Sequence, residues 1–261
     1  MKIYIDPGHG GNDPGAVGNG LKEKEIALDI AKRMAKVLEE YAGVDVKLSR
    51  TADITKSLAA RTNEANAWNA AIFLSIHCNA FNGKVRGYED FVYNRLTPNA
   101  TARRYQAILH KAVTDRMNMP NRGKKQANFH VLRESQMPAI LTENGFIDHP
   151  EDGELMKQAD WRKQVAKGHV AGLANIFHLN KSIPMKESYA VIAGSFQSPA
   201  NAEGRTIFLE AKGIDSHIEQ TEFGEYTMYR VQAGTYQTRI EAEKQLQTIK
   251  NSGVEGFILK R

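Results

Sequence analysis

Apolar strand-like runs alternate with helical patterns from residue 1 to residue 178, and no other feature limits the possible folds as strongly. Parallel strands need a long crossover between them, which a helix usually supplies, so this alternation is typical of a sheet covered by helices. The predicted strands are 2–6, 44–49, 71–77, 87–93, 129–133 and 139–143. The predicted helices are 23–41, 55–69, 98–117 and 160–177. The pattern therefore predicts an α/β fold with a mainly parallel, twisted sheet flanked by helices.

The C-terminal part contains an internal repeat, in which the segment 189–198 recurs as 229–238. Each copy predicts a strand, a turn, a helix and a strand, so two copies predict a small α+β domain with the order βαββαβ. Polar residues and a proline interrupt the preceding helical pattern. We therefore expect a larger first domain at 1–179, a linker at 180–187 and a smaller second domain at 188–261.

Composition narrows the kinds of site and partner. The single cysteine, Cys78, excludes an internal disulfide and a cysteine-rich metal site. Residues 1–180 contain 25 Lys and Arg against 20 Asp and Glu, whereas residues 181–261 contain ten of each kind. A modest basic excess suits an anionic partner, such as a teichoic-acid-bearing cell wall or a nucleic acid, although an ordinary solvated surface also accounts for it.

The beginning of the chain has the pattern of a strand and not that of a targeting segment. It lacks the basic start, the apolar middle and the small-residue cleavage site of a signal peptide. No stretch of the sequence is long and apolar enough to cross a membrane. We therefore expect a protein without a transmembrane segment that is made in the cytoplasm and acts outside it only after release.

Four polar side chains stand where they could share one site. His9 follows the first predicted strand and Glu23 begins the first predicted helix, while His77 and Glu143 end two later strands. Ligands of open α/β sheets gather at the carboxyl ends of the strands. Two histidines and a carboxylate are a common catalytic zinc set with an open position for water, and a further carboxylate can move a proton. The sequence thus indicates hydrolysis by zinc-activated water.

Helical phase distinguishes Glu23 from the nearby Glu25. Glu23 shares a face with the apolar residues Ile26 and Ile30, whereas Glu25 shares a face with Asp29. A carboxylate on the core side of a helix is costly unless it is paired or binds a metal. Glu23 is therefore the predicted ligand, and the alternative is a carboxylate that stabilises the positive end of the helix.

Strand alternation separates His77 from Cys78, which is expected to be a buried apolar residue and not a ligand. Glu143 fits a general acid or base, and the alternative is a structural glutamate paired with an arginine. The other six histidines are expected to be structural or to lie on the surface, with His130 the best placed of them to line a cleft. They are His110, His130, His149, His169, His178 and His217.

Several segments match one family in order along the chain. They are Asp6–Ala16, Glu23–Lys24, Leu48–Arg50, Leu58 with Arg61, Leu74–Ala80 and Pro138–Ile147. Through these segments, residues 1–178 resemble the zinc-dependent N-acetylmuramoyl-L-alanine amidases of the Amidase_3 type. The repeat resembles a SPOR domain, a module that recognises peptidoglycan glycan strands stripped of stem peptides. The second copy keeps the valine-glutamine of that pattern at Val231-Gln232, whereas the first copy has Val191-Ile192.

The resemblance implies that His9, Glu23 and His77 bind Zn²⁺ and that Glu143 is catalytic. The implied substrate is the amide between N-acetylmuramic acid and L-alanine in peptidoglycan. The implied role is cell-wall lysis, either of a sporulating mother cell or for release of a phage.

Further contacts with peptidoglycan are expected on both domains. Asn79 and Arg50 are candidates for orienting the stem peptide at the catalytic domain. Gln232 is a candidate for contact with glycan strands at the C-terminal domain. We expect a monomer that binds no nucleic acid.

Three alternatives use the same residues differently. A zinc peptidase that cuts within the stem peptide would need the same metal set. A catalytically inactive relative would bind the wall only, although all four key residues are present. A βαββαβ unit could also bind RNA, but RNA recognition favours a basic sheet with stacking aromatic residues, and this part of the chain is neutral.

Overall fold

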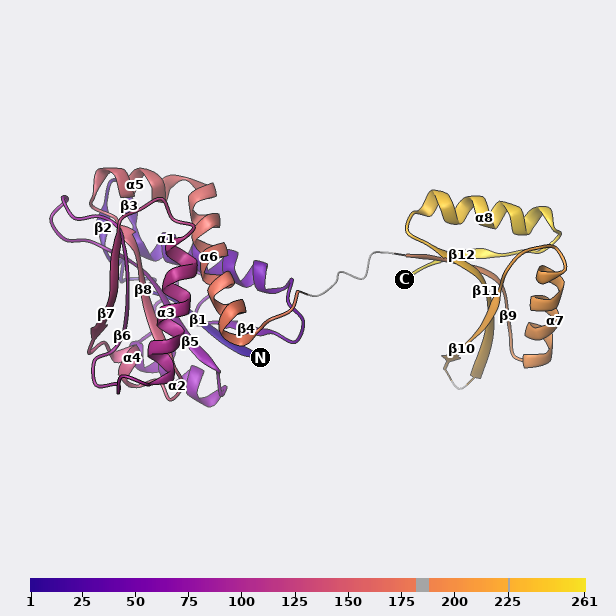
Figure 1. The fold of residues 1–261 in the computed structure, drawn as a ribbon, viewed down its shortest axis with the longest axis horizontal. Coiled ribbons are helices and arrows are strands. Elements are labelled where there is room, and N and C mark those ends of the chain that lie inside the picture. Colours follow the sequence, from indigo (N-terminus) through magenta and orange to yellow (C-terminus); the bar gives the residue numbers. More distant parts are fainter. Residues whose placement is uncertain (182–187, 225) are drawn as a thin grey trace. The chain divides into compact units, whose positions relative to one another are not determined.

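The computed structural model describes residues 1–181, 188–224 and 226–261, and it divides into two compact units, Met1–Ser182 and Ile183–Arg261 (Figure 1). Of the predicted linker at 180–187, residues 182–187 lie outside the described residues, so the linker stays a prediction. Across the described part of the chain, no helix is both long and apolar enough to cross a membrane.

A six-stranded sheet forms the centre of the N-terminal unit, with the strand order β4-β1-β5-β8-β6-β7. Its strands are β1 (Lys2–Pro7), β4 (Asp45–Leu48), β5 (Ile72–Asn79), β6 (Tyr88–Tyr93), β7 (Asn121–Ala127) and β8 (Ala139–Phe146). Strands β4, β1, β5 and β8 are parallel to one another, β6 runs antiparallel to β8, and β7 is parallel to β6. The predicted, mainly parallel sheet is confirmed.

Helices cover both faces of this sheet (Figure 1). One face packs against α1 (Glu23–Leu38), α3 (Thr101–Thr114) and α6 (Ala159–Phe177). The other face packs against α2 (Leu58–Ala67) and the short α4 (His130–Arg133). The hairpin β2 (Val17–Gly18) and β3 (Leu21–Lys22) precedes α1, and α5 (Pro150–Lys157) precedes α6. Because the first five residues of β5 are all buried, four of them are apolar, and Ser75 is the exception.

Two local predictions are wrong. The segment predicted as a strand at 129–133 forms helix α4, since a short apolar run does not distinguish a buried strand from a buried turn of helix. The basic segment 122–125, which lies outside all the predicted strands and helices, belongs to strand β7. β7 lies at the edge of the sheet and alternates between exposed and half-buried residues, so it lacks the apolar signal of the inner strands.

The C-terminal unit has the predicted order βαββαβ. Its elements are β9 (Tyr189–Phe196), α7 (Pro199–Glu210), β10 (His217–Phe223), β11 (Tyr226–Tyr236), α8 (Arg239–Asn251) and β12 (Phe257–Lys260). The four strands form an antiparallel sheet in the order β10-β11-β9-β12. Equivalent residues of the repeat, Val191 with Ala193 and Val231 with Ala233, pack in one core beneath the helices.

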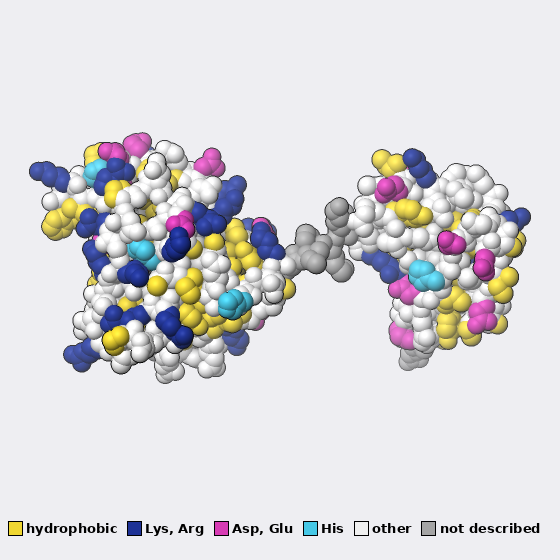
Figure 2. Space-filling view, in the orientation of Figure 1, with side chains coloured by type: hydrophobic (Ala, Val, Ile, Leu, Met, Phe, Trp, Pro, Cys, Tyr) yellow, Lys and Arg dark blue, Asp and Glu magenta, His cyan; other side chains and the backbone are white. Residues whose placement is uncertain are grey.

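The basic excess of the N-terminal unit is visible on its surface. On the face drawn in Figure 2, Lys and Arg side chains are prominent over this unit, whereas acidic and basic side chains are mixed on the C-terminal unit. The surface therefore follows the distribution of charge along the sequence.

Candidate metal centre and active site

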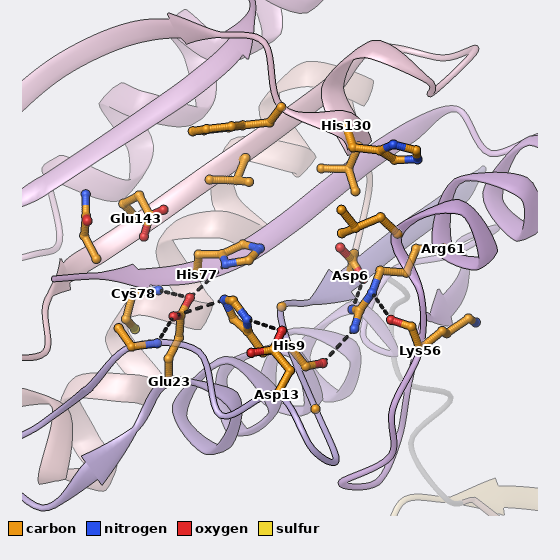
Figure 3. Close-up of a pocket in the computed structure, with 18 of the residues that line it drawn as sticks. Asp6, His9, Asp13, Glu23, Lys56, Arg61, His77, Cys78, His130 and Glu143 are labelled. Carbon is orange, nitrogen blue, oxygen red and sulfur yellow. Dashed lines mark hydrogen bonds and ion pairs between the residues drawn. The ribbon is translucent and has the colours of Figure 1, made fainter.

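The site lies where strands β1, β5 and β8 end. Strand register places Asp6 beside Ser75, and places His77 beside Glu143. Because alternate residues of a strand share a face, these side chains lie on the side of the sheet that carries α2 and α4. A cleft of about 680 Å³ opens there, and Figure 3 shows His77, Glu143 and His130 around it.

A sharp turn after β1 brings His9 over the ends of the strands. His9 has a φ of 58°, and the two glycines that follow also have positive φ values, 129° at Gly10 and 59° at Gly11. A side chain at Gly8 would place its Cβ 2.3 Å from His77 Cε1, so the close approach of this loop to β5 requires glycine. The Pro-Gly-His-Gly-Gly segment is therefore shaped to put one histidine against another.

Two buried arginines hold this turn. Arg50 is 2% exposed and donates to the carbonyl oxygens of Pro7 at 3.1 Å, Gly8 at 2.7 Å and Lys24 at 2.7 Å. Arg61 donates to the carbonyl oxygens of Pro7 at 2.8 Å and His9 at 2.7 Å. Arg50 does not line the cleft. The predicted role of Arg50 in orienting substrate does not fit this placement, because its donors are already used by the backbone.

Glu23 begins α1 and is 3% exposed, whereas Glu25 is exposed, as helical phase predicts. The carboxylate of Glu23 is fixed by two backbone amides: Oε2 accepts from Ala16 at 2.7 Å and Oε1 accepts from Cys78 at 3.0 Å. Burial raises the pKa of Glu23, but hydrogen bonds and charge interactions with His77 and His9 lower it by more, and the net shift is strongly downward. Glu23 is therefore ionised.

Each oxygen of Glu23 also faces one ring nitrogen (Figure 3). Oε1 lies 2.8 Å from His77 Nδ1, and Oε2 lies 3.1 Å from His9 Nε2. An ionised carboxylate can only accept hydrogen bonds, so each contact needs a proton or a metal cation between the two atoms. Burial lowers the pKa of His9, but the carboxylates of Glu23 and Asp13 outweigh this effect and raise it.

The donor set of His9, Glu23 and His77 fits Zn²⁺, because its three ligand atoms lie within 4.8 Å of one another and combine two imidazoles with a carboxylate. All three side chains line the cleft, and a tetrahedral Zn²⁺ held by them would have one further position for water or substrate. Within residues 1–181, 188–224 and 226–261, no second group of three such side chains converges in this way. Cys78 packs in the core, where burial raises its pKa first and nearby carboxylates raise it further.

Glu143 lies across from His77 on the neighbouring strand and lines the same cleft. Its Oε2 atom is buried and has no hydrogen-bond partner. Burial, followed by the negative charges of Glu23 and Glu89, raises the pKa of Glu143 well above its usual value. A buried carboxyl oxygen without a partner is costly, and it is typical of a group kept available for proton transfer.

Sequence reasoning missed Glu89, which lies directly opposite Glu143 in the antiparallel pair of β6 and β8. Glu89 is 3% exposed and accepts from Arg122 Nε at 2.7 Å and from Asn79 Nδ2 at 3.0 Å. Asn79 lines the cleft, as its predicted contact with substrate requires, but its amide group is engaged by Glu89. Only the strand pairing reveals Glu89, because the sequence near residue 89 carries no motif.

His130 also lines the cleft, which confirms its expected position. It lies well away from Glu143 (Figure 3), and the exposed side chains of Phe129 and Leu58 line the same cleft. The lining of the cleft thus combines the candidate metal ligands with apolar side chains such as Leu58 and Val131, a combination suited to a substrate larger than one amide bond.

In the C-terminal unit, Gln232 lies on the sheet face that points away from α7 and α8. It is only 5% exposed, and its amide group donates to Thr235 Oγ1 and accepts from Arg261 Nη2. Three aromatic residues on the same face are far more accessible. They are Phe223, Tyr226 and Phe257, which are 70%, 63% and 44% exposed.

Comparison with known sequences decides the family. The family described as N-acetylmuramoyl-L-alanine amidase matches residues 3–175, which include all the site residues named above except those of the C-terminal unit. The chain belongs to this family. A SPOR domain matches residues 186–260, so both resemblances seen in the sequence are confirmed.

Relatives agree with this assignment over most of the chain. The sporulation-specific N-acetylmuramoyl-L-alanine amidase of Bacillus subtilis is 47% identical over 219 residues, which cover 84% of each chain. The endolysin of Bacillus phage SPP1 is 40% identical over 192 residues, or 71% of this chain and 70% of the endolysin. The crystal structure of an N-acetylmuramoyl-L-alanine amidase from Clostridium difficile 630 superposes with a TM-score of 0.65 at 34% identity, covering 68% of this chain and 96% of that one.

The protein is therefore an N-acetylmuramoyl-L-alanine amidase that acts on peptidoglycan. This confirms the predicted enzyme class and substrate.

Proposed function

We propose that this amidase hydrolyses the bond between N-acetylmuramic acid and L-alanine with Zn²⁺ held by His9, Glu23 and His77. The observation that supports the proposal best is the convergence of these ligand atoms beside the unpartnered carboxyl oxygen of Glu143. When three protein ligands hold it, Zn²⁺ lowers the pKa of its bound water to about 7, and the Zn²⁺ ion also polarises the carbonyl of the scissile amide. Side chains of the protein carry out the remaining steps.

Glu143 acts as the general base and then as the general acid. It lies opposite His77 on the same face of the sheet, so a water molecule in the cleft can come within its reach. Its carboxylate takes a proton from this water during attack on the amide carbonyl, and the resulting carboxylic acid returns the proton to the departing alanine nitrogen. Since Oε2 has no internal partner, neither transfer requires breaking a hydrogen bond within the protein.

Digestion of purified peptidoglycan followed by mass analysis tests the reaction. We expect new free L-alanine amino termini, which disappear with EDTA and return with added Zn²⁺. Glu143→Gln should lower the rate by about 10²–10⁴-fold while zinc affinity is retained, because it removes proton transfer only. Products released from inside the stem peptide would instead support the zinc peptidase, and no hydrolysis at all would support the inactive wall-binding protein.

A matched pair of substitutions on α1 tests the ligand assignment. Glu23→Gln should abolish tight zinc binding, because it removes the charge that both histidines face. Glu25→Gln, an identical change at an exposed position two residues away, should leave zinc affinity and activity unchanged. Equal effects of the two substitutions would contradict the assignment.

We further propose that the C-terminal unit binds glycan strands through its sheet face, with the exposed aromatic residues making more of the contact than the buried Gln232. Aromatic rings offer flat apolar surfaces for the apolar faces of sugar rings. In the full chain carrying Glu143→Ala, so that no wall is digested, Phe257→Ala should weaken binding to glycan stripped of stem peptides. Phe208→Ala changes an aromatic residue of similar exposure, 42% against 44%, on helix α7, and should have no effect.

The proposal requires Phe257→Ala to weaken glycan binding more than Phe208→Ala does. Equal binding of the unaltered chain to intact and to stripped walls would contradict recognition of stripped glycan. A larger loss of binding in Phe208→Ala than in Phe257→Ala would indicate that glycan contacts the helices and not the sheet.

We propose cell-wall lysis as the biological role, reached after release from the cytoplasm. Both a sporulation-specific amidase and a phage endolysin are among the relatives, and the two roles share one reaction. They differ in when the protein is made. Measuring transcript levels through sporulation and after prophage induction separates a mother-cell enzyme from a phage enzyme, and constant expression in growing cells would contradict both.

A further inference from the structure

Behind His77, away from Glu23, three buried side chains continue the site into the protein. His77 Nε2 lies 3.1 Å from Ser75 Oγ, and Ser75 Oγ lies 2.8 Å from Asp6 Oδ2. Asp6 Oδ1 in turn lies 2.6 Å from Arg61 Nη1. Ser75, Asp6 and Arg61 are 0%, 1% and 3% exposed, so water does not interrupt the chain of contacts.

Arg61, the last member of this hydrogen-bonded series, determines which atom donates and which accepts in each of its hydrogen bonds. An arginine side chain only donates, so Asp6 accepts from Arg61. Burial alone would raise the pKa of Asp6, but Arg61 together with hydrogen bonds from neighbouring hydroxyls lowers it, and the carboxylate is ionised. An ionised carboxylate only accepts, so the single hydroxyl proton of Ser75 is donated to Asp6. Ser75 Oγ can then only accept from His77, which requires a proton on His77 Nε2.

The opposite arrangement would be costly. If Ser75 donated to His77 Nε2, the Oδ2 atom of Asp6 would lose a donor while buried and charged. Leaving a buried acceptor without its partner costs about 1–3 kcal/mol, and more for a charged group. The chain therefore favours one tautomer of His77.

We propose that Arg61, Asp6 and Ser75 are positioning residues that fix His77 in the tautomer with Nε2 protonated, so that Nδ1 is the atom that binds the metal. His77 Nδ1 is the nitrogen that lies 2.8 Å from Glu23 Oε1. His9 is held the opposite way, since its Nδ1 lies 2.8 Å from Asp13 Oδ2 and its Nε2 faces Glu23. The two histidines thus present different nitrogens, one supported by an exposed acid and the other by a buried chain.

This inference rests on the proposed zinc site, and it names Arg61, Asp6 and Ser75 as residues that increase the affinity of that site for Zn²⁺. Partners that orient a ligating histidine are worth about 10–100-fold in metal affinity. Loss of the Ser75 hydroxyl would leave His77 Nε2 without an acceptor and its ring free to take either tautomer. We therefore expect Ser75→Ala to weaken zinc binding by about 10–100-fold.

Nitrogen-15 NMR of the histidine rings in the full chain, with and without Zn²⁺, tests the tautomer directly. In the unaltered protein, addition of Zn²⁺ should shift His77 Nδ1 while Nε2 keeps its proton. In Ser75→Ala, zinc titration against a chelator should show the weakened affinity, and the His77 signals should no longer report a single tautomer. Thr62→Val is the matched control and should change neither affinity nor tautomer, because it also removes one buried hydroxyl, but that hydroxyl donates to carbonyl oxygens within α2 and does not line the cleft.

The outcomes separate this inference from the zinc site itself. If zinc shifts neither the His9 nor the His77 rings, the proposed metal site is wrong. If zinc binds His77 through Nε2, or if Ser75→Ala keeps both affinity and tautomer, the metal site stands and the positioning chain is refuted. The nitrogen assignment in the unaltered protein needs no substitution, so it decides the question even if Ser75→Ala does not fold.

Discussion

Replacing Arg50 with methionine should destabilise the N-terminal unit and should not act through substrate binding. The guanidinium donates to three carbonyl oxygens in the turn after β1 and at the start of α1, at 3.1, 2.7 and 2.7 Å. A buried acceptor left without its donor costs about 1–3 kcal/mol, and neighbouring losses are not additive, so we expect the free energy of unfolding to fall by about 3–5 kcal/mol. Arg50→Lys keeps the charge but not the planar fork, and should lose less.

Tryptophan fluorescence during urea unfolding measures this effect in the full chain. The two tryptophans of the sequence, Trp68 and Trp161, both lie in the N-terminal unit, so their signal reports on this unit alone. Measurements in EDTA remove any contribution from bound metal. The control is Arg104→Met on the exposed side of α3, which should change the free energy of unfolding by no more than about 0.5 kcal/mol.

If Arg50→Met is as stable as Arg104→Met but raises KM for peptidoglycan, Arg50 does not stabilise the turn after β1. That result would restore the role in orienting substrate that the sequence alone indicated.

Two further substitutions have clear expected results. Gly15 and Gly43 share a φ of 67°, but a Cβ at Gly15 would lie 2.5 Å from Glu23 Oε2, whereas nothing lies within 4 Å at Gly43. Gly15→Ala should therefore lower zinc affinity, measured by chelator competition, and Gly43→Ala should cost only backbone strain, so equal affinities would contradict the expectation. At His110, burial lowers the pKa but Asp90, 2.8 Å away, raises it by more. Because the folded pKa is raised, this stabilisation is complete below about pH 6.5 and is lost as the pH rises through the folded pKa. The decrease in unfolding free energy from pH 6 to pH 8 should thus be smaller in His110→Gln, and an identical decrease would show that His110 is not its source.

The convergence of His9, Glu23 and His77 could be predicted because local geometry is sufficient to select these side chains. Helical phase distinguishes Glu23 from Glu25 within one turn of α1, and strand alternation separates His77 from Cys78. The structure shows Glu23 buried against the histidines and Glu25 exposed. Such inferences need only the period of one helix or one strand, and tertiary packing does not change that period.

Residues that depend on pairing between strands could not be found in this way. Glu89 meets Glu143 only because β6 runs antiparallel to β8, and Asp6 meets Ser75 only through the register of β1 with β5. Strand β7 was missed for a related reason, since an edge strand carries little apolar signal of its own. The periodicity within one segment gives no information about the register in which two strands pair.

The burial of Arg50 has a different cause, which links the proposed metal ligands to the residues that support them. A turn with positive φ at His9 carries the imidazole to the proposed metal site, and the same turn directs the carbonyl oxygens of Pro7, Gly8 and His9 toward buried arginines. Buried carbonyl groups need donors, and outside the helices and strands no backbone amide of the described residues donates to the carbonyl oxygens of Gly8 and His9. Arg50 and Arg61 supply them, so the conformation that brings His9 to Glu23 also creates the need for two buried arginines. Loss of either arginine should therefore lower both stability and zinc affinity, even though neither side chain is among the proposed metal ligands.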